Sequence, residues 1–222
     1  MKLSSNTISV LKNYASINQN LVIKEGKEIT TMSAMKNIVA KAKVEESFEK
    51  EVAIYDLNEF LASLSLFKSP VLEFDEGFVK IKEENTTTHL KYFYSDPSVV
   101  TTPGKTIKMP SKEVTFSLKG EDLTKLKRAA GVIGAPDLVL EKKDTGSFLT
   151  VKDKKNDTAN TFSLDVTTTS EGNFNCFFTV ENLKVMDGNY DVEISSKNIS
   201  HLSSSNKDVE YWVALEPEST YE

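Results

Sequence analysis

The chain has 222 residues, enough for one large or two modest domains, and carries 27 Lys and Arg against 33 Asp and Glu, a formal net charge of −6. This balance argues against a protein that coats nucleic acid through overall positive charge, but a local basic surface stays open. Hydrophobic residues make up 39% of the chain, and no stretch approaches the ~18 apolar residues of a membrane-spanning helix.

The single cysteine, Cys176, lies in the apolar run 174–178. One thiol excludes a disulfide within the chain and agrees with a reducing cytoplasm. In such a run a cysteine packs as a small apolar residue, so we expect it to be buried and unreactive. The first residues lack the apolar core of a secretory signal peptide, which favours the same compartment.

The chain begins with a predicted helix. Residues 4–6, Ser-Ser-Asn, are typical helix caps, and a helix is expected from there to about Ile17. Ile8, Leu11 and Ala15 share one face of this helix and are expected to be buried. The next predicted strands are 21–23, two short ones within 27–43, and 52–55.

A second helix is predicted between Asp56, which caps it, and Pro70, which ends it, over residues 57–67. Asp75-Glu76-Gly77 then marks a hairpin turn between two apolar strands. The strands expected here are 71–74, 78–82 and 89–94.

Residues 96–113 differ in character and predict a connector. Pro97, Pro103, Gly104 and Pro110 fall within this stretch, and they disfavour both helices and central strands. We therefore divide the chain into an N-terminal domain (1–95), the connector (96–113) and a C-terminal domain (114–222).

The second half restarts with a helix near residue 120. Leu123, Leu126 and Ala130 form its expected buried stripe, and Gly131 or Gly134 ends it. The remaining expected elements are strands at 138–141, 148–152, 161–168, 174–179, 190–195, 199–203 and 208–215, a short helix at 181–186, and an exposed acidic tail at 216–222.

One pattern occurs twice, at 52–61 and again at 177–186. In both places an apolar strand leads into a predicted short helix that an acidic residue opens. Each copy follows an amphipathic helix and precedes hairpin strands. A duplicated α+β unit indicates a pseudo-symmetric scaffold rather than a single catalytic pocket.

The order and spacing of several stretches resemble one family, the DNA polymerase sliding clamps (processivity factors) of T-even-type bacteriophages. The stretches are Met1-Lys2-Leu3-Ser4, Leu11-Lys12-Asn13, Val52-Ala53-Ile54-Tyr55-Asp56-Leu57-Asn58 with Phe60-Leu61, Asp96-Pro97-Ser98, Glu121-Asp122-Leu123, Gly188-Asn189-Tyr190 and Val213-Ala214-Leu215-Glu216. The resemblance implies an α+β DNA-clamp fold with two similar domains per subunit, inner helices backed by outer antiparallel sheets.

The resemblance also implies a function. Three identical subunits would form a ring lined by twelve helices that encircles double-stranded DNA without reading its sequence. The ring would tether the replicative DNA polymerase, be placed by a clamp loader, and act in the cytoplasm of the infected bacterial host. Transcription factors are further partners that the resemblance implies.

A clamp needs cations that attract phosphates weakly, so exposed lysines on the inner helices are candidates. The candidates are Lys2, Lys12, Lys119, Lys125, Lys127, Arg128 and Lys184. The resemblance favours Lys12, Lys125 and Arg128. Gly131 stands where the family tends to carry a second arginine, which shifts the basic surface. The alternative is that these cations belong to ordinary solvated helix faces.

Two further sites follow from the resemblance. A groove for partner peptides would lie beside the connector and the C-terminal segment, formed by Val100, Ile107, Met109, Val213, Leu215 and Pro217. Val213 and Leu215 could instead belong to the core of the last strand. Edge strands would close the ring, with Leu90, Tyr92 and Tyr94 of one subunit against Phe162, Leu164 and Val166 of the next.

The sequence offers little for catalysis. His89 and His201 each lie in a predicted strand without metal-ligand spacing, and no phosphate-binding glycine loop or nucleophile elbow occurs. We expect no enzyme, cofactor, metal or membrane partner. The alternative function is a non-enzymatic phage structural or assembly protein with a duplicated α+β scaffold, which need not form a closed trimer.

Overall fold

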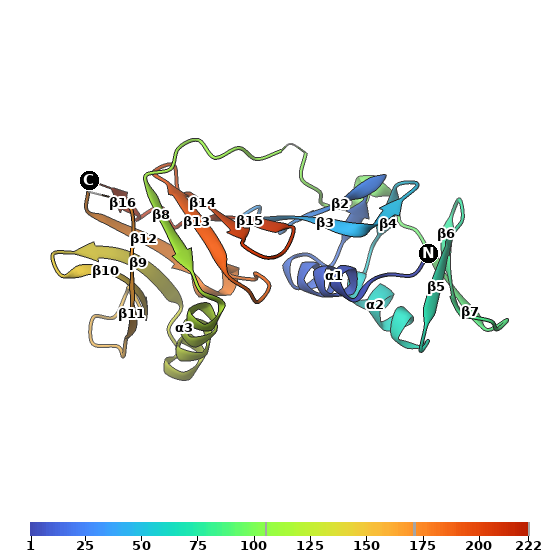
Figure 1. Ribbon diagram of the computed structural model, residues 1–222, viewed down its shortest axis with the longest axis horizontal. Coiled ribbons are helices and arrows are strands. Elements are labelled where there is room, and N and C mark those ends of the chain that lie inside the picture. The colour runs from blue at the N-terminus through green and yellow to red at the C-terminus, as the bar shows by residue number, and fades with distance from the viewer. Residues whose placement is uncertain (105, 171, 222) are drawn as a thin grey trace. The chain divides into compact units, whose positions relative to one another are not determined.

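A computed structural model describes residues 1–104, 106–170 and 172–221. The chain divides into two units, Met1–Lys105 and Thr106–Glu222, each with its own helices and antiparallel sheets (Figure 1). Residue 105 of the expected connector and residue 222 of the expected tail lie outside the described residues. No helix in the described ranges is long and apolar enough to cross a membrane.

Among its described residues the N-terminal unit contains two α-helices and seven strands. The helices are α1 (Ser5–Ile17) and α2 (Leu57–Ser65), and the strands are β1 (Leu21–Ile23), β2 (Gly26–Met32), β3 (Ile38–Phe48), β4 (Val52–Ile54), β5 (Pro70–Phe74), β6 (Phe78–Glu83) and β7 (His89–Phe93). Strand β1 pairs with β4, β2 with β3, and β5, β6 and β7 form a meander. The predicted positions of these elements are confirmed within a few residues except for β3, which is not short and extends beyond the expected range 27–43 to Phe48.

Helix α1 begins where the sequence predicts, but it buries a different face. Ser4 caps it by accepting a hydrogen bond from the Thr7 backbone N–H at 3.1 Å. Its buried residues are Thr7, Val10, Leu11, Tyr14 and Ile17. The expected stripe of Ile8, Leu11 and Ala15 was therefore wrong at its first and third positions.

A polar residue takes a core position in α1 because a carboxylate satisfies it. Glu46 on β3 accepts hydrogen bonds from the Thr7 hydroxyl and the Ser4 backbone N–H. Burial of Glu46 would raise the pKa of its carboxyl, but these hydrogen bonds hold that pKa below its usual range. The carboxylate thus stabilises both the start of α1 and its packing on β3.

The connector does not begin as a free linker. A short 3₁₀ turn, η1 (Pro97–Val99), follows β7, and Val100 is then buried against Val22 and Ala53. Val100 therefore anchors the start of the connector to the core of the N-terminal unit, while residues 96–99 before it are exposed.

The C-terminal unit contains one α-helix and nine strands within the described residues. They are β8 (Val114–Leu118), α3 (Gly120–Ile133), β9 (Asp137–Lys143), β10 (Gly146–Lys152), β11 (Phe162–Val166), β12 (Phe174–Thr179), β13 (Tyr190–Ser195), β14 (Ile199–Ser204), β15 (Val209–Ala214) and β16 (Thr220–Tyr221). One sheet has the order β11-β10-β9-β12-β16, and β8, β13, β14 and β15 lie side by side in another. Strand β8 was not predicted.

Helix α3 confirms its predicted stripe. Leu123, Leu126 and Ala130 are its buried residues, and Gly134 ends it in the left-handed conformation at φ 67°. The helix therefore ends at Gly134 rather than Gly131, and glycine suits this position because it has no side chain to disfavour a positive φ.

The short helix predicted at 181–186 was wrong. The structure has only a 3₁₀ turn, η2 (Val180–Asn182), followed by irregular backbone. Leu183 and Val185 are buried while Lys184 between them is half-buried, an alternation that belongs to extended chain. The Met186 N–H donates to the Tyr211 hydroxyl at 3.2 Å, so tertiary contacts replace helical hydrogen bonds here.

The acidic tail is also not free. Thr220 and Tyr221 form β16 and pair with Asn175 and Phe174 of β12. Beneath this strand Cys176 is fully buried, as predicted. Burial raises the pKa of its thiol to about 12, against a smaller lowering by the hydrogen bond from Tyr221.

Candidate DNA and partner interfaces

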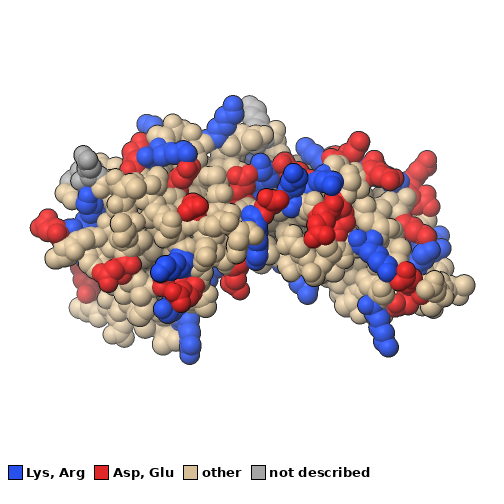
Figure 2. All heavy atoms as spheres, viewed as in Figure 1, with Lys and Arg blue, Asp and Glu red and all other residues tan. Residues whose placement is uncertain are grey.

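Each α-helix exposes one polar face that could meet a polyanion. Lys12 lies among serines on α1, α2 exposes no cation, and α3 exposes Lys125 and Arg128. The exposed positions of the helices are Ser5, Ser9, Lys12 and Ser16 on α1, Asn58, Glu59, Ala62 and Ser65 on α2, and Glu121, Thr124, Lys125, Arg128, Gly131 and Val132 on α3. Figure 2 shows cations and anions interspersed over the visible face of each unit.

The seven cationic candidates differ in how free their charges are. Lys12 and Arg128 are exposed, and no ion pair within the described residues involves them. The Lys125 ammonium is 3.7 Å from the Asp122 carboxylate. Lys119 is exposed at the start of α3. These four remain available to a phosphate.

The other three candidates are engaged within their own unit. Lys2 pairs with Glu84 at 2.6 Å. Lys127 is half-buried and donates to the Val185 carbonyl at 3.3 Å; burial lowers the pKa of its ammonium, opposed by Asp187. Lys184 is half-buried, and it also interacts with another part of the protein. Local periodicity could not reveal these contacts because Lys127 is held by a distant segment.

The six residues of the predicted peptide groove fall into two groups. Val100, Val213 and Leu215 are buried, at 8%, 0% and 6% exposure. Ile107 and Met109 are half-buried, and Pro217 is exposed. Because a buried side chain offers no surface to a partner, Val213 and Leu215 are core residues in this structure, as the alternative interpretation held.

The predicted subunit-interface residues lie on two edge strands, except Tyr94, which directly follows β7. Strand β7 ends the β5-β6-β7 sheet, and the opposite edge is covered at Leu72, which exchanges two 2.7 Å hydrogen bonds with Met1. Strand β11 ends the five-stranded sheet. Among the described residues no strand pairs with the outer edges of β7 and β11, so their backbone groups are free to pair with another chain.

The side chains on these edges differ in availability. Tyr92 is buried, donates its hydroxyl to the Asp56 carbonyl at 3.0 Å, and packs edge-to-face on Phe60 with ring centroids 5.3 Å apart. It stabilises its own unit, while Leu90, Tyr94 and the three residues of β11 are half-buried. Phe93, which the sequence interpretation missed, is 69% exposed.

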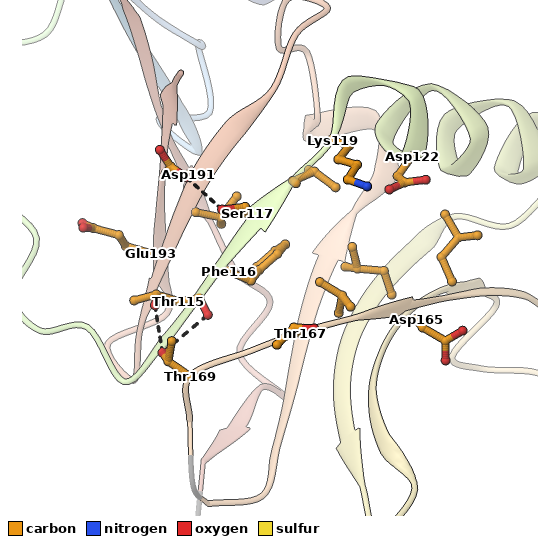
Figure 3. A pocket seen from close by; sticks show the side chains of 15 residues that line it. Thr115, Phe116, Ser117, Lys119, Asp122, Asp165, Thr167, Thr169, Asp191 and Glu193 are labelled. Atoms are coloured by element: carbon orange, nitrogen blue, oxygen red, sulfur yellow. Dashed lines mark hydrogen bonds between the residues drawn. The ribbon is translucent and has the colours of Figure 1, made fainter. Parts of the chain in front are cut away.

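A hollow of about 640 Å³ runs beside β11 and opens between that strand and β8 (Figure 3). Phe116 and Leu164 provide apolar lining, and Asp122, Asp165 and Asp191 provide carboxylates. Thr169 and Ser117 are tied down by hydrogen bonds to Thr115 and Asp191. No cluster of metal-ligating side chains occurs within the described ranges.

Comparisons with known proteins agree along the whole chain. A family model described as DNA polymerase processivity factor matches residues 2–102, and one described as gp45 sliding clamp, C terminal, matches residues 115–217. Proteins named Sliding clamp are 34% identical in Vibrio phage KVP40 (97% of this chain, 99% of the relative) and 32% in Escherichia phage RB69 (100% of both). That of Enterobacteria phage T4 is 31% identical over 100% of both.

Solved structures share the fold at low identity. The PCNA of A. fulgidus, solved with the C-terminal region of FEN-1, matches with a TM-score of 0.71 at 15% identity over 99% of this chain and 98% of that one. The PCNA of Entamoeba histolytica matches with a TM-score of 0.65 at 14% identity, over 95% and 94%.

Two α+β units of this fold, with these family matches, define a DNA polymerase processivity factor. The chain belongs to the sliding clamp family, together with the clamps of these three bacteriophages. The predicted family, fold class and clamp function are confirmed, and the family is not a catalytic one. One detail of the predicted fold differs, because four helices per subunit were expected and the described residues contain three α-helices.

Proposed function

We propose that three copies of this chain close head to tail into a ring around duplex DNA and hold the replicative polymerase on its template. The observation that carries this proposal is that each unit has a free edge strand, β7 in one and β11 in the other. A head-to-tail contact uses both edges of every copy, and a closed ring leaves neither unpaired.

In this proposal the helices face the DNA and do no bond chemistry. Lys12, Lys125 and Arg128 attract phosphates, and exposed serines and Thr124 are among the neutral residues beside them. Few cations per subunit favour weak, sequence-independent contacts that break as the ring moves. The protein then acts through topology, in the cytoplasm of the infected host.

Partner proteins would bind through short segments. The A. fulgidus clamp, which shares this fold, has the C-terminal region of FEN-1 bound to it. In the present chain Pro217 is exposed and Ile107 and Met109 are half-buried, so they support a docking site for polymerase, clamp loader or transcription factors. No specific observation favours the alternative of a phage assembly protein.

The first test is native mass as a function of concentration. One copy is 24.7 kDa, and we expect a species of three times that mass that dissociates on dilution. A monomer at every concentration would overturn the ring.

The second test is retention on DNA. With clamp loader and nucleotide present, we expect the protein to stay on closed circular DNA and to leave when the circle is cut. Replacing Lys12, Lys125 and Arg128 together by alanine should weaken loading and reduce its salt dependence, whereas Lys27→Ala, an exposed lysine on β2, should not. Equal behaviour of both variants would remove these residues from the DNA surface.

A further inference from the structure

The side chains of β7 sort onto two faces. Leu90 and Tyr92 lie opposite the buried Ile81 and Val79 of β6, on the side where Tyr92 contacts α2. The other face carries His89, Lys91 and Phe93, all exposed. A strand added to β7 would therefore meet an apolar row on the α2 side and a basic row on the other side.

Lys80 on β6 lies between Glu73 on β5 and Lys91 on β7, so its charge is offset on one side and meets a like charge on the other. Lys80 and Lys91 are directly opposite each other in the β6–β7 register. Like charges in that position destabilise a sheet. The Lys91 ammonium lies 4.5 Å from the centre of the Phe78 ring, which keeps its stem along the sheet surface at the free edge. An acidic residue brought to this edge would relieve the repulsion.

Strand β11 has the matching pattern. Phe162 and Leu164 lie opposite the apolar Val151 and Leu149 of β10, on the side of α3. Ser163 and Asp165 are exposed on the other face, and Asp165 points away from α3 in Figure 3. This edge therefore carries an apolar row on the helix side and a carboxylate on the other.

We propose that β7 of one copy pairs antiparallel with β11 of the next in the register that places Lys91 opposite Asp165. The same register places Leu90 opposite Val166 and Tyr92 opposite Leu164, on the helix side of the joined sheet. This inference rests on the proposed head-to-tail ring and specifies its contact residue by residue.

Other registers do not match both the apolar rows and the Lys91–Asp165 charge pair. A slip by one residue turns Lys91 toward the apolar row, because successive side chains alternate between faces. A slip by two residues places Asp165 opposite Phe93 in one direction and opposite His89 in the other, and Lys91 then loses its carboxylate.

Cross-linking tests the register. Residues directly opposite in an antiparallel pair have Cα atoms about 4.5–5.5 Å apart, within the range that a disulfide spans. With Lys91→Cys and Asp165→Cys in one chain, mild oxidation should give covalent dimers and trimers. The control is Lys91→Cys with Ser163→Cys, on the same face but at a diagonal of about 7–8 Å, which should cross-link poorly. The buried Cys176 stays unreactive in both.

The outcomes separate this inference from the proposed function. If the native mass shows a trimer but the control pair links as well as the test pair, or neither links, the register is wrong and the ring stands. If the unmodified protein is a monomer at all concentrations, both fail.

Charge exchange gives a second measurement that does not depend on cysteine chemistry. Lys91→Asp should raise the concentration at which the trimer dissociates by about tenfold, and adding Asp165→Lys should restore it. Lys27→Asp and Asp157→Lys make the same charge changes at exposed positions away from both edges and should have no effect. Failure of the double variant to recover would overturn the pairing.

Discussion

The two copies of the strand-to-helix pattern, at 52–61 and 177–186, fold differently. In the first, Asp56 accepts hydrogen bonds from the N–H groups of Asn58 and Glu59 at 2.9 and 3.1 Å, and α2 follows for nine residues. In the second, Thr179 makes no side-chain cap, and only a single 3₁₀ turn forms. The first copy therefore has a side-chain cap at its helix start, and the second copy has none.

The core contacts of the two copies differ in the same way. Leu57, Phe60 and Leu64 are buried at helical spacing in α2. Leu183 and Val185 are buried at strand spacing after η2. A similar order of apolar and acidic residues therefore allowed both outcomes, and the surrounding core selected between them.

The largest expected effect comes from removing the aromatic anchor of the first copy. Phe60 is 3% exposed and packs on Tyr92. Phe60→Ala should lower the free energy of unfolding by about 3–4 kcal/mol, because it opens a cavity between α2 and β7. Urea denaturation measures this, with Asn58→Ala, an exposed position of α2, as the control. A small change in both variants would mean that α2 is not held by this contact.

The next largest effect is expected where the start of α3 approaches the chain just after the second copy. A Cβ at Gly120 would lie 2.9 Å from the Gly188 carbonyl oxygen, so Gly120→Ala must move backbone. We expect a loss of about 2 kcal/mol. Gly131→Ala, in the same helix with nothing within 4 Å of the added carbon, should instead stabilise the protein by up to about 1 kcal/mol. Thermal unfolding measures both variants. Stability changes of the same sign for Gly120→Ala and Gly131→Ala would contradict this prediction.

The capping difference can be measured directly. Asp56→Ala removes both cap hydrogen bonds and should cost about 1 kcal/mol. Glu181→Ala changes the matching acid of the second copy, which is exposed, and should stay within about 0.5 kcal/mol. Equal losses in chemical denaturation would contradict the distinction between the two copies.

The smallest effect concerns pH. The pKa values of Glu46 in the N-terminal unit and Glu113 in the C-terminal unit are both held low, because hydrogen bonds from Thr7 and Ser4, and from Ser196 and Ser111, outweigh the effect of burial. A depressed pKa contributes stability above the unfolded value of about 4.5 that is lost as pH falls through the folded value.

Replacing either glutamate by glutamine should therefore cost less than about 1 kcal/mol at neutral pH and reduce the loss of stability below pH 4.5. Denaturation curves at pH 7 and pH 3.5 give the comparison. A variant whose stability falls with acid as steeply as the parent would show that its carboxylate does not contribute.

The sequence predicted most of what depends on neighbouring residues. The α3 stripe, the Asp56 cap and the turn at Gly146 follow from local periodicity and backbone preference. The α1 face could not be predicted, because Thr7 is buried only through Glu46, 39 residues away. Strand β8 was missed although Val114-Thr115-Phe116-Ser117-Leu118 alternates apolar and polar residues, a local strand signal; it pairs with β13.

The candidate sites were predicted with the same limits. Lys12 and Arg128 are exposed as expected because they lie opposite the buried stripes of their helices. Lys127 is engaged by Val185, and Val100 is buried against β1 and β4, through contacts that no local pattern encodes. Phe93 was not predicted, because the alternation along β7 marks its inward row and does not distinguish among the outward residues.

The C-terminal strand has a practical consequence. Phe177 donates its N–H to the Ser219 hydroxyl at 3.0 Å, and the Lys154 ammonium lies 3.4 Å from the Glu218 carboxylate, so the last residues are fastened at several points. The thiol of Cys176 lies under them. A maleimide reacts only with an accessible thiol. The rate at which it labels Cys176 would therefore report how often β16 detaches from β12. A partner that displaces or stabilises this last strand would change that rate.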